Sequence, residues 1–302
     1  MKKLIYLFCI LIFVSCQEVF IPDFADEEPT VVVEGYIQAG PEAVPVFVTL
    51  SKTFPLFQTD TIKGPELFLG GATMRVEGNG QSVELTEICT NSLDPEVKEL
   101  LINTLGIDEA FLDFDICFYT DLANEITALV GEEYDLIVQF EGEEIRANTS
   151  IPPFVAIDSF NIFNPGSFDT ERQLTGFLSD PPEPNFYRLK LAVNGGPLRN
   201  PFSVVDDVLF DNQTFEFPIN NQPDPNEDDF DPNTAGLYEI GDTVLVQWQT
   251  IDMAHYDFWN TLEFARGNQG PFASYTRADS NIEGGIGIWG GSSVGYYNLI
   301  IE

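Results

Sequence analysis

The sequence predicts a mainly β protein with two β-sandwich units of the immunoglobulin or fibronectin type. Short runs of alternating or β-branched residues recur about every ten residues, with clusters of Gly, Pro, Asn and Asp between them. Helical spacing is confined to two stretches after residue 15, which predict a helical excursion in the first unit and one amphipathic helix in the second. A hydrophobic fraction of 44%, with 26 Phe residues, is typical of a globular protein with a core.

Residues 1–15 predict an export signal. Lys2 and Lys3 precede an unbroken apolar run that ends at Val14, and this run is too short to span a bilayer, which needs about 20 residues. Ser15-Cys16 resembles the lipobox of bacterial lipoproteins, in which the chain is cleaved before the cysteine and the cysteine is acylated. The resemblance implies Cys16 as the lipidation site and the acidic residues 16–29 as an extended tether. An ordinary secretory peptide with an incidental cysteine is the alternative.

The first unit is expected over residues 30–152. Asn79-Gly80 and Glu141-Gly142 each predict a tight turn between two strands. Asp94 and Pro95 predict the start of a helix that Gly106 ends. The strands are expected at residues 31–37, 45–52, 72–77, 82–87, 133–140 and 143–150.

Four cysteines are present, and two of them belong to the first unit. Cys9 lies in the export signal and Cys16 is the proposed lipid site, so Cys89 and Cys117 remain. Two such residues in an exported protein predict a disulfide that closes the base of the helical excursion. Two buried free thiols are the alternative.

The second unit is expected over residues 153–302, after the Pro152-Pro153 junction. Residues 252–266 predict a helix whose broad apolar surface is suited to cover an open sandwich end or a sheet edge. The Gly-rich stretch 284–291 matches no phosphate-binding loop and indicates close backbone packing or bulges. Strands are expected at residues 157–163, 173–178, 185–193, 242–249 and 294–301. A single elongated β domain is the alternative to two units.

The charge and the histidine content exclude several functions. The chain has 49 acidic and 13 basic residues, for a formal net charge of −36, and such a field repels nucleic acid and anionic lipid headgroups. His255 is the only histidine, so histidine-based metal sites and Ser-His-Asp catalysis lack their partners. We therefore expect a non-enzymatic protein that binds no nucleic acid.

A calcium site is the one cofactor that the sequence suggests. Asp224, Asn226 and Asp228 stand at alternate positions, as at the start of a calcium-binding loop. However, Asp229 stands where such a loop has glycine, and Ala235 stands where it has a bidentate glutamate. A solvated acidic loop is the alternative.

Several short motifs together resemble a known family. They are Val31–Ile37, Val48–Ser51, Gly71–Val76, Tyr134–Val138, Ile151–Pro153, Tyr256-Asp257, Asn281-Ile282 and Gly284–Ile288. In this order they look like a Bacteroidota family of outer-membrane lipoproteins that carry a domain of unknown function and are often encoded beside TonB-dependent receptors.

The resemblance implies a lipid-anchored outer-membrane protein that serves as an accessory or ligand-capture subunit of a TonB-dependent transporter. Its alternative is a surface adhesin or structural envelope protein that binds a polymer or another surface protein. The acids at Glu18, Asp23 and 26–28 resemble the export signals of surface lipoproteins, so the cell surface is favoured over the periplasmic face.

Overall fold

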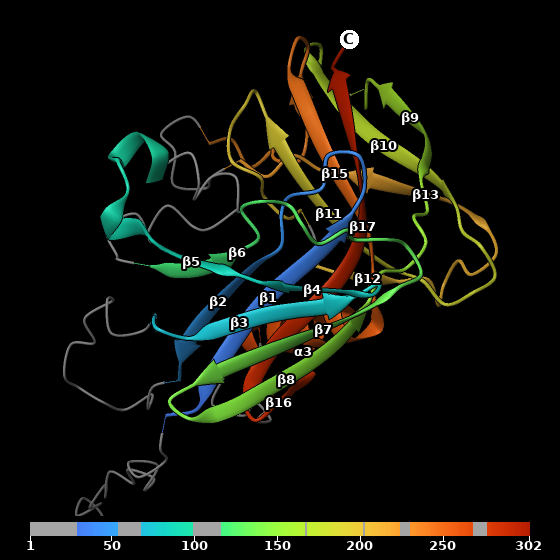
Figure 1. The fold of residues 1–302 in the computed structure, drawn as a ribbon. Coiled ribbons are helices and arrows are strands. Elements are labelled where there is room, and N and C mark those ends of the chain that lie inside the picture. The colour runs from blue at the N-terminus through green and yellow to red at the C-terminus, as the bar shows by residue number, and fades with distance from the viewer. Residues whose placement is uncertain are drawn as a thin grey trace, which may run out of the picture. The chain divides into compact units, whose positions relative to one another are not determined.

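A computed structural model describes residues 29–53, 68–98, 116–166, 168–201, 203–223, 230–267 and 277–302 (Figure 1). The fold is mainly β, as the sequence predicts, and the described residues from Thr30 onward belong to one compact unit. The predicted export signal, Cys16 and most of the tether lie outside the described residues. Within the described ranges, no helix is long and apolar enough to cross a membrane.

An eight-stranded sheet runs through the whole unit. Its strands, in spatial order, are β12 (Val205–Asp206), β11 (Phe186–Val193), β15 (Thr243–Ile251), β17 (Ile286–Ile300), β1 (Val31–Ala39), β2 (Phe47–Lys52), β6 (Cys117–Thr120) and β5 (Thr86–Cys89).

The long strand β17 joins the two halves of this sheet (Figure 1). Its residues 286–293 pair in parallel with β1, and its residues 292–300 pair antiparallel with β15. The two pairings overlap only at Ser292 and Ser293, so one strand carries the sheet from the first half of the chain into the second.

Two smaller sheets complete the β structure. The five-stranded sheet has the order β16 (Ile282–Glu283), β8 (Glu143–Ser150), β7 (Glu133–Phe140), β3 (Thr73–Gly78) and β4 (Gln81–Glu84). The four-stranded sheet contains β13 (Thr214–Ile219), β10 (Glu171–Ser179) and β14 (Tyr238–Glu239), with β9 (Ile157–Phe163) paired to β10.

Two hydrophobic cores lie between the large sheet and the smaller ones. The buried residues of the first core lie between Val33 and Ile151, together with Ile282 and Trp289. Those of the second core lie between Val155 and Ile301. On β17, Trp289 belongs to the first core, whereas Tyr297 and Leu299 pack against the second. Because side chains alternate along a strand, these odd-numbered residues share one face, and both smaller sheets cover that face.

The boundary predicted at residue 152 falls where one core gives way to the other. The large sheet nevertheless draws strands from both predicted units, and β16 and β17 bring the end of the chain into the first core. The strand predicted at residues 82–87 is divided at Leu85, because β4 belongs to the five-stranded sheet and β5 to the eight-stranded sheet.

The helix α3 (Met253–Gly267) lies against β17 and β11 of the large sheet. Asp252 caps it, because its Oδ1 accepts the backbone N–H of His255 at 3.0 Å. The expected helix is therefore present, but it covers a sheet face instead of an open end or edge. Gly290 makes this approach possible, since a Cβ there would lie 2.8 Å from His255 Nδ1.

The Gly-rich stretch packs backbone against backbone, as the sequence predicts. A Cβ at Gly291 would lie 2.1 Å from the Ser150 carbonyl oxygen, and one at Gly287 would lie 1.9 Å from the Val33 carbonyl oxygen. Most of this stretch is part of β17 itself, which begins eight residues before the strand predicted there. In the helical excursion, Asp94 Oδ1 accepts the Glu96 N–H at 3.1 Å, and residues 99–115 lie outside the described ranges.

Candidate functional site

The part of the fold around the second hydrophobic core contains a pocket of about 380 Å³, which we call the aromatic pocket. Its polar lining residues are Asp206 and Asn220. Five aromatic rings also line it, and they belong to Tyr187, Phe210, Phe215, Phe217 and Trp248. This size, with a mostly apolar lining and few polar groups, is typical of small-molecule sites.

Strand alternation places these rings on one side. Tyr187 of β11 stacks on Trp248 of β15 with a centroid distance of 5.1 Å, and Phe217 of β13 lies 5.3 Å from Trp248. Phe215, two residues before Phe217, stacks on Phe210 at 4.3 Å. The result is a nearly parallel array of rings between the two sheets, which suits the planar face of a ring-shaped ligand.

Apolar side chains are also exposed beside the pocket. Phe215 is 37% exposed, and the turn before Phe210 carries Val208 at 74% and Leu209 at 89%. Leu209 belongs to the pocket lining. Exposed apolar groups that adjoin a pocket mark a contact surface for a ligand or a partner.

Three carboxylates lie behind the pocket wall. Ligand oxygens of Asp180, Asp207 and Asp211 are all within 4.8 Å of one another, and Asp180 and Asp207 are buried. Asp180 accepts hydrogen bonds from the Tyr187 hydroxyl and from the Asn212 N–H at 3.2 Å.

Burial raises the pKa of Asp180 above its ordinary value, and the charges of Asp207 and Asp211 add to the rise. The Tyr187 pKa is also raised, first by burial and then by Asp180. Residues 200–265 contain no Lys or Arg, so no base of that stretch offsets these acids. Their oxygens are of the kind that could hold a hard cation such as Ca²⁺.

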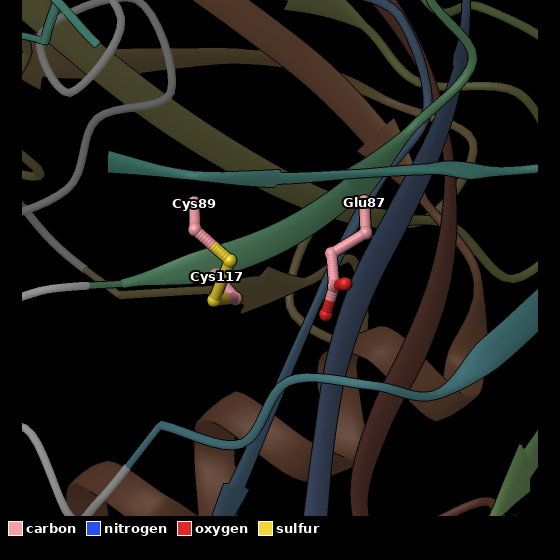
Figure 2. Close-up of side chains that lie close together, drawn as sticks. All are labelled: Glu87, Cys89 and Cys117. Atoms are coloured by element: carbon pink, nitrogen blue, oxygen red, sulfur yellow. A yellow bond between two sulfur atoms is a disulfide. The ribbon is translucent and has the colours of Figure 1, made fainter. Parts of the chain in front are cut away.

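A second group of possible metal ligands is Glu87, Cys89 and Cys117, drawn in Figure 2. Cys89 and Cys117 lie directly opposite each other on β5 and β6, and their sulfur atoms form the predicted disulfide. Sulfur in a disulfide is not a thiolate ligand, so the oxidised pair does not form a metal site. In the chain-entropy model, closing 28 residues contributes about 3–4 kcal/mol to stability.

Glu87 has structural partners of its own. Its Oε1 accepts the Gly71 N–H at 2.6 Å and the Tyr119 hydroxyl at 2.7 Å. Burial, together with this carboxylate, raises the pKa of Tyr119 to about 12. The residues of Figure 2 therefore tie β5 and β6 to the segment before β3.

A larger hollow of about 860 Å³ lies where β11 and β17 end and β15 begins. Its lining includes Gly195, Gly196 and Leu198, and it contains neither an aromatic ring nor a charged side chain. Volume alone would favour this hollow, but without aromatic or charged side chains it has few groups that could orient a ligand. The aromatic pocket is therefore the stronger candidate.

The proposed calcium ligands Asp224, Asn226 and Asp228 lie outside the described residues, as does Cys16, so both sites stay predictions. The aromatic pocket was not predictable from the sequence. Its rings come from segments up to about 60 residues apart in the chain, as for Tyr187 and Trp248, and only the alternation of Phe215 and Phe217 is a local signal.

Comparison with known proteins identifies the family of this chain. A family model described as Domain of unknown function (DUF4249) matches residues 17–297. No curated protein matches the sequence. Because the match spans nearly all of the sequence, the chain belongs to the DUF4249 family.

Proposed function

We propose that this protein is a non-enzymatic outer-membrane lipoprotein that captures a small ligand for a TonB-dependent transporter. The aromatic pocket carries the proposal, because its volume of about 380 Å³ and its ring-lined walls suit a small molecule with a flat apolar surface. The lipobox at Cys16 supports the membrane anchor. The transporter rests on the family resemblance set out in the sequence analysis.

The pocket favours capture by burial of ring surface. Tyr187 and Trp248 are almost fully buried, whereas Phe215 is 37% exposed. A ligand would therefore meet fixed rings inside and one accessible ring at the mouth. Asp206 and Asn220 supply the polar contacts that orient it, and the Asp206 Oδ2 already accepts the Tyr256 hydroxyl at 2.9 Å.

Native mass spectrometry of the protein purified from its own membranes tests ligand capture. We expect a bound small molecule on the wild type and about tenfold less of it on Phe215→Ala, because a stacking ring is lost. Phe163→Ala is the matched control, since Phe163 is also 37% exposed in the same sheet but does not line the pocket. Equal occupancy of the two variants would count against the pocket.

The exposed turn at Val208 and Leu209 favours a protein partner, which both a transporter subunit and an adhesin would have. Pull-down from detergent-solubilised outer membranes distinguishes these two functions. We expect a large β-barrel to co-purify with the wild type and to be lost with Leu209→Asp, whereas Ile240→Asp, at a 49% exposed position outside the pocket, retains it. Retention of a surface polymer without a barrel would support the adhesin instead.

The anchor is tested separately. Cys16→Ser should release a folded protein into the soluble fraction, because the acyl chains on Cys16 would hold the protein stably on the membrane. If that variant stays with the membrane and no partner co-purifies, the anchor is placed wrongly.

A further inference from the structure

The face of β11 opposite the aromatic pocket carries two basic side chains. Tyr187 points into the pocket, so its neighbour Arg188 and, two residues on, Lys190 lie on the other face of the large sheet. Arg188 is only 5% exposed, and Lys190 is partly buried. We call these two residues the basic pair.

Among the described residues, Arg188 has no carboxylate partner of the kind that a buried guanidinium normally has. It lies over the Trp259 ring at 4.1 Å from the centroid, and its Nη1 lies 3.3 Å from His255 Nε2. Its buried Nε has no hydrogen-bond partner in the part of the chain that the structure describes. The ion pairs between described residues, Arg75–Glu77 and Arg146–Glu144, do not involve Arg188.

The contact with His255 is between a charged and a neutral group. Burial, and then the charge of Arg188, hold the pKa of His255 well below its ordinary value. The neutral imidazole can accept one Arg188 N–H but brings no negative charge. The Nε–H of the guanidinium is thus a buried donor without an acceptor among the described residues, which is costly unless an anion accepts from it.

Gln247 adds a third group beside Lys190. The two residues are directly paired across β11 and β15, so their side chains are neighbours on this face. Gln247 Nε2 donates to the Tyr296 hydroxyl at 2.7 Å, while its buried Oε1 has no partner. Since the O and N positions of an amide are interchangeable, a flipped Gln247 amide would accept from the Tyr296 hydroxyl and place its NH₂ where the unpartnered Oε1 lies.

The charges of Arg188, Lys190 and Glu34 balance only when Lys190 is neutral. Glu34 is near enough to raise the pKa of Lys190, but its Oε1 accepts the Tyr36 hydroxyl at 2.9 Å and it forms no ion pair with either base. Burial first, and Arg188 second, lower the pKa of Lys190 to about 7. Two bases and one acid leave a single positive charge when Lys190 is protonated, which a monovalent anion would neutralise.

We propose that the basic pair binds one carboxylate group on the sheet face opposite the aromatic pocket. The arginine fork suits the two oxygens of a carboxylate, and Lys190 and the Gln247 amide supply further donors. The site does not depend on the proposed capture function. The carboxylate belongs either to a free organic acid or to an acidic side chain of a partner, and the chemistry is the same.

A titration with acetate tests the site. The intact, detergent-solubilised protein is labelled with 5-fluorotryptophan, which gives three ¹⁹F signals because the chain has three tryptophans. Acetate replaces chloride at constant ionic strength. We expect the Trp259 signal, assigned with Trp259→Phe, to shift saturably because its ring faces Arg188. A net charge of −36 disfavours unspecific anion binding, so saturation marks a specific site.

Lys190 provides the variants, because it is partly exposed and its replacement should leave the fold intact. Lys190→Gln should weaken acetate binding about tenfold, and Lys190→Arg should retain it. Arg199→Gln, at an exposed arginine whose side chain donates to the Gln222 carbonyl and whose backbone bonds to Leu191 do not depend on the side chain, should leave acetate binding unchanged.

A second titration uses a blocked hexaglutamate peptide. Tighter binding of the peptide than of acetate assigns the site to a partner's acidic side chain, and tighter binding of acetate assigns it to a free acid. No saturable shift of Trp259 with either probe, or one that Lys190→Gln leaves unchanged, would overturn the proposal.

Discussion

Replacing Asp252 tests how the helix α3 is held to the β structure. Its Oδ1 accepts the His255 N–H at 3.0 Å, and its Oδ2 accepts the Thr149 hydroxyl at 2.7 Å. Asp252→Ala removes a helix cap worth about 1 kcal/mol. It also leaves the Thr149 hydroxyl, which is 2% exposed, without its partner, at a cost of about 1–3 kcal/mol. The free energy of unfolding should therefore fall by about 2–4 kcal/mol.

The matched variant is Asp252→Asn, because an amide keeps one acceptor for the His255 N–H and can donate to Thr149. Its loss at pH 7 should be below about 1 kcal/mol. Urea unfolding followed by tryptophan fluorescence measures both variants. Equal destabilisation by Ala and Asn would refute the assigned hydrogen bonds.

The same pair has a defined pH dependence. Burial raises the pKa of Asp252 above its ordinary value, despite hydrogen bonds from Thr149 and His255 that oppose the rise. The folded carboxyl therefore holds its proton at a pH where the unfolded one has lost it. The stability that this provides is present at low pH and is lost as the pH rises through the folded pKa. The free energy of unfolding of the wild type should therefore rise relative to that of Asp252→Asn as the pH is lowered toward 4.

Three further predictions concern other parts of the fold. Replacing Cys89 and Cys117 by serine should lower the free energy of unfolding by about 3–4 kcal/mol, and reductant should then have no added effect on the melting temperature. The pKa of His255 lies well below its unfolded value near 6.5, so the folded protein should lose up to about 1.4 kcal/mol per pH unit below pH 6.5; a pH series in which His255→Gln shows the same slope as wild type would contradict this. Gly291→Ala would place a Cβ 2.1 Å from the Ser150 carbonyl oxygen, so urea unfolding should show a loss of more than about 2 kcal/mol, and a near-neutral result would refute that close approach.

Local features of the fold were predictable from the sequence. Asn79-Gly80 and Glu141-Gly142 both form the tight turns expected, with positive φ at all four residues. Asp252 and Asp94 both cap the segments that follow them. Each of these signals depends on residues within about five positions of one another, where side-chain type directly limits backbone conformation.

The sheet order was not predictable in this way. The pairing of β1 with β17 joins residues about 250 positions apart, and no local pattern specifies such a contact. The first half of β17 was not recognisable as a strand because it is rich in glycine, which is a poor strand former and normally indicates turns. Here glycine is required because the His255 ring lies close to Gly290 and the Ser150 carbonyl oxygen lies close to Gly291.

The candidate site shows the same limit. Phe215 and Phe217 could be placed on one strand face by their spacing, but their meeting with Tyr187 and Trp248 follows from the sheet order. Likewise, Arg188 and Lys190 are visible as neighbours on a strand face, whereas the absence of a contacting acid among the described residues becomes apparent only in three dimensions.

Ligand capture in the aromatic pocket is the central claim, and ¹⁹F NMR of the 5-fluorotryptophan protein tests it most directly. The ligand released by denaturing the purified protein is added back to ligand-free protein. We expect a saturable shift of the signal of Trp248, whose ring lines the pocket, and no shift of the signal of Trp289 in the first core. No shift of Trp248, or an equal shift in Phe215→Ala, would contradict it.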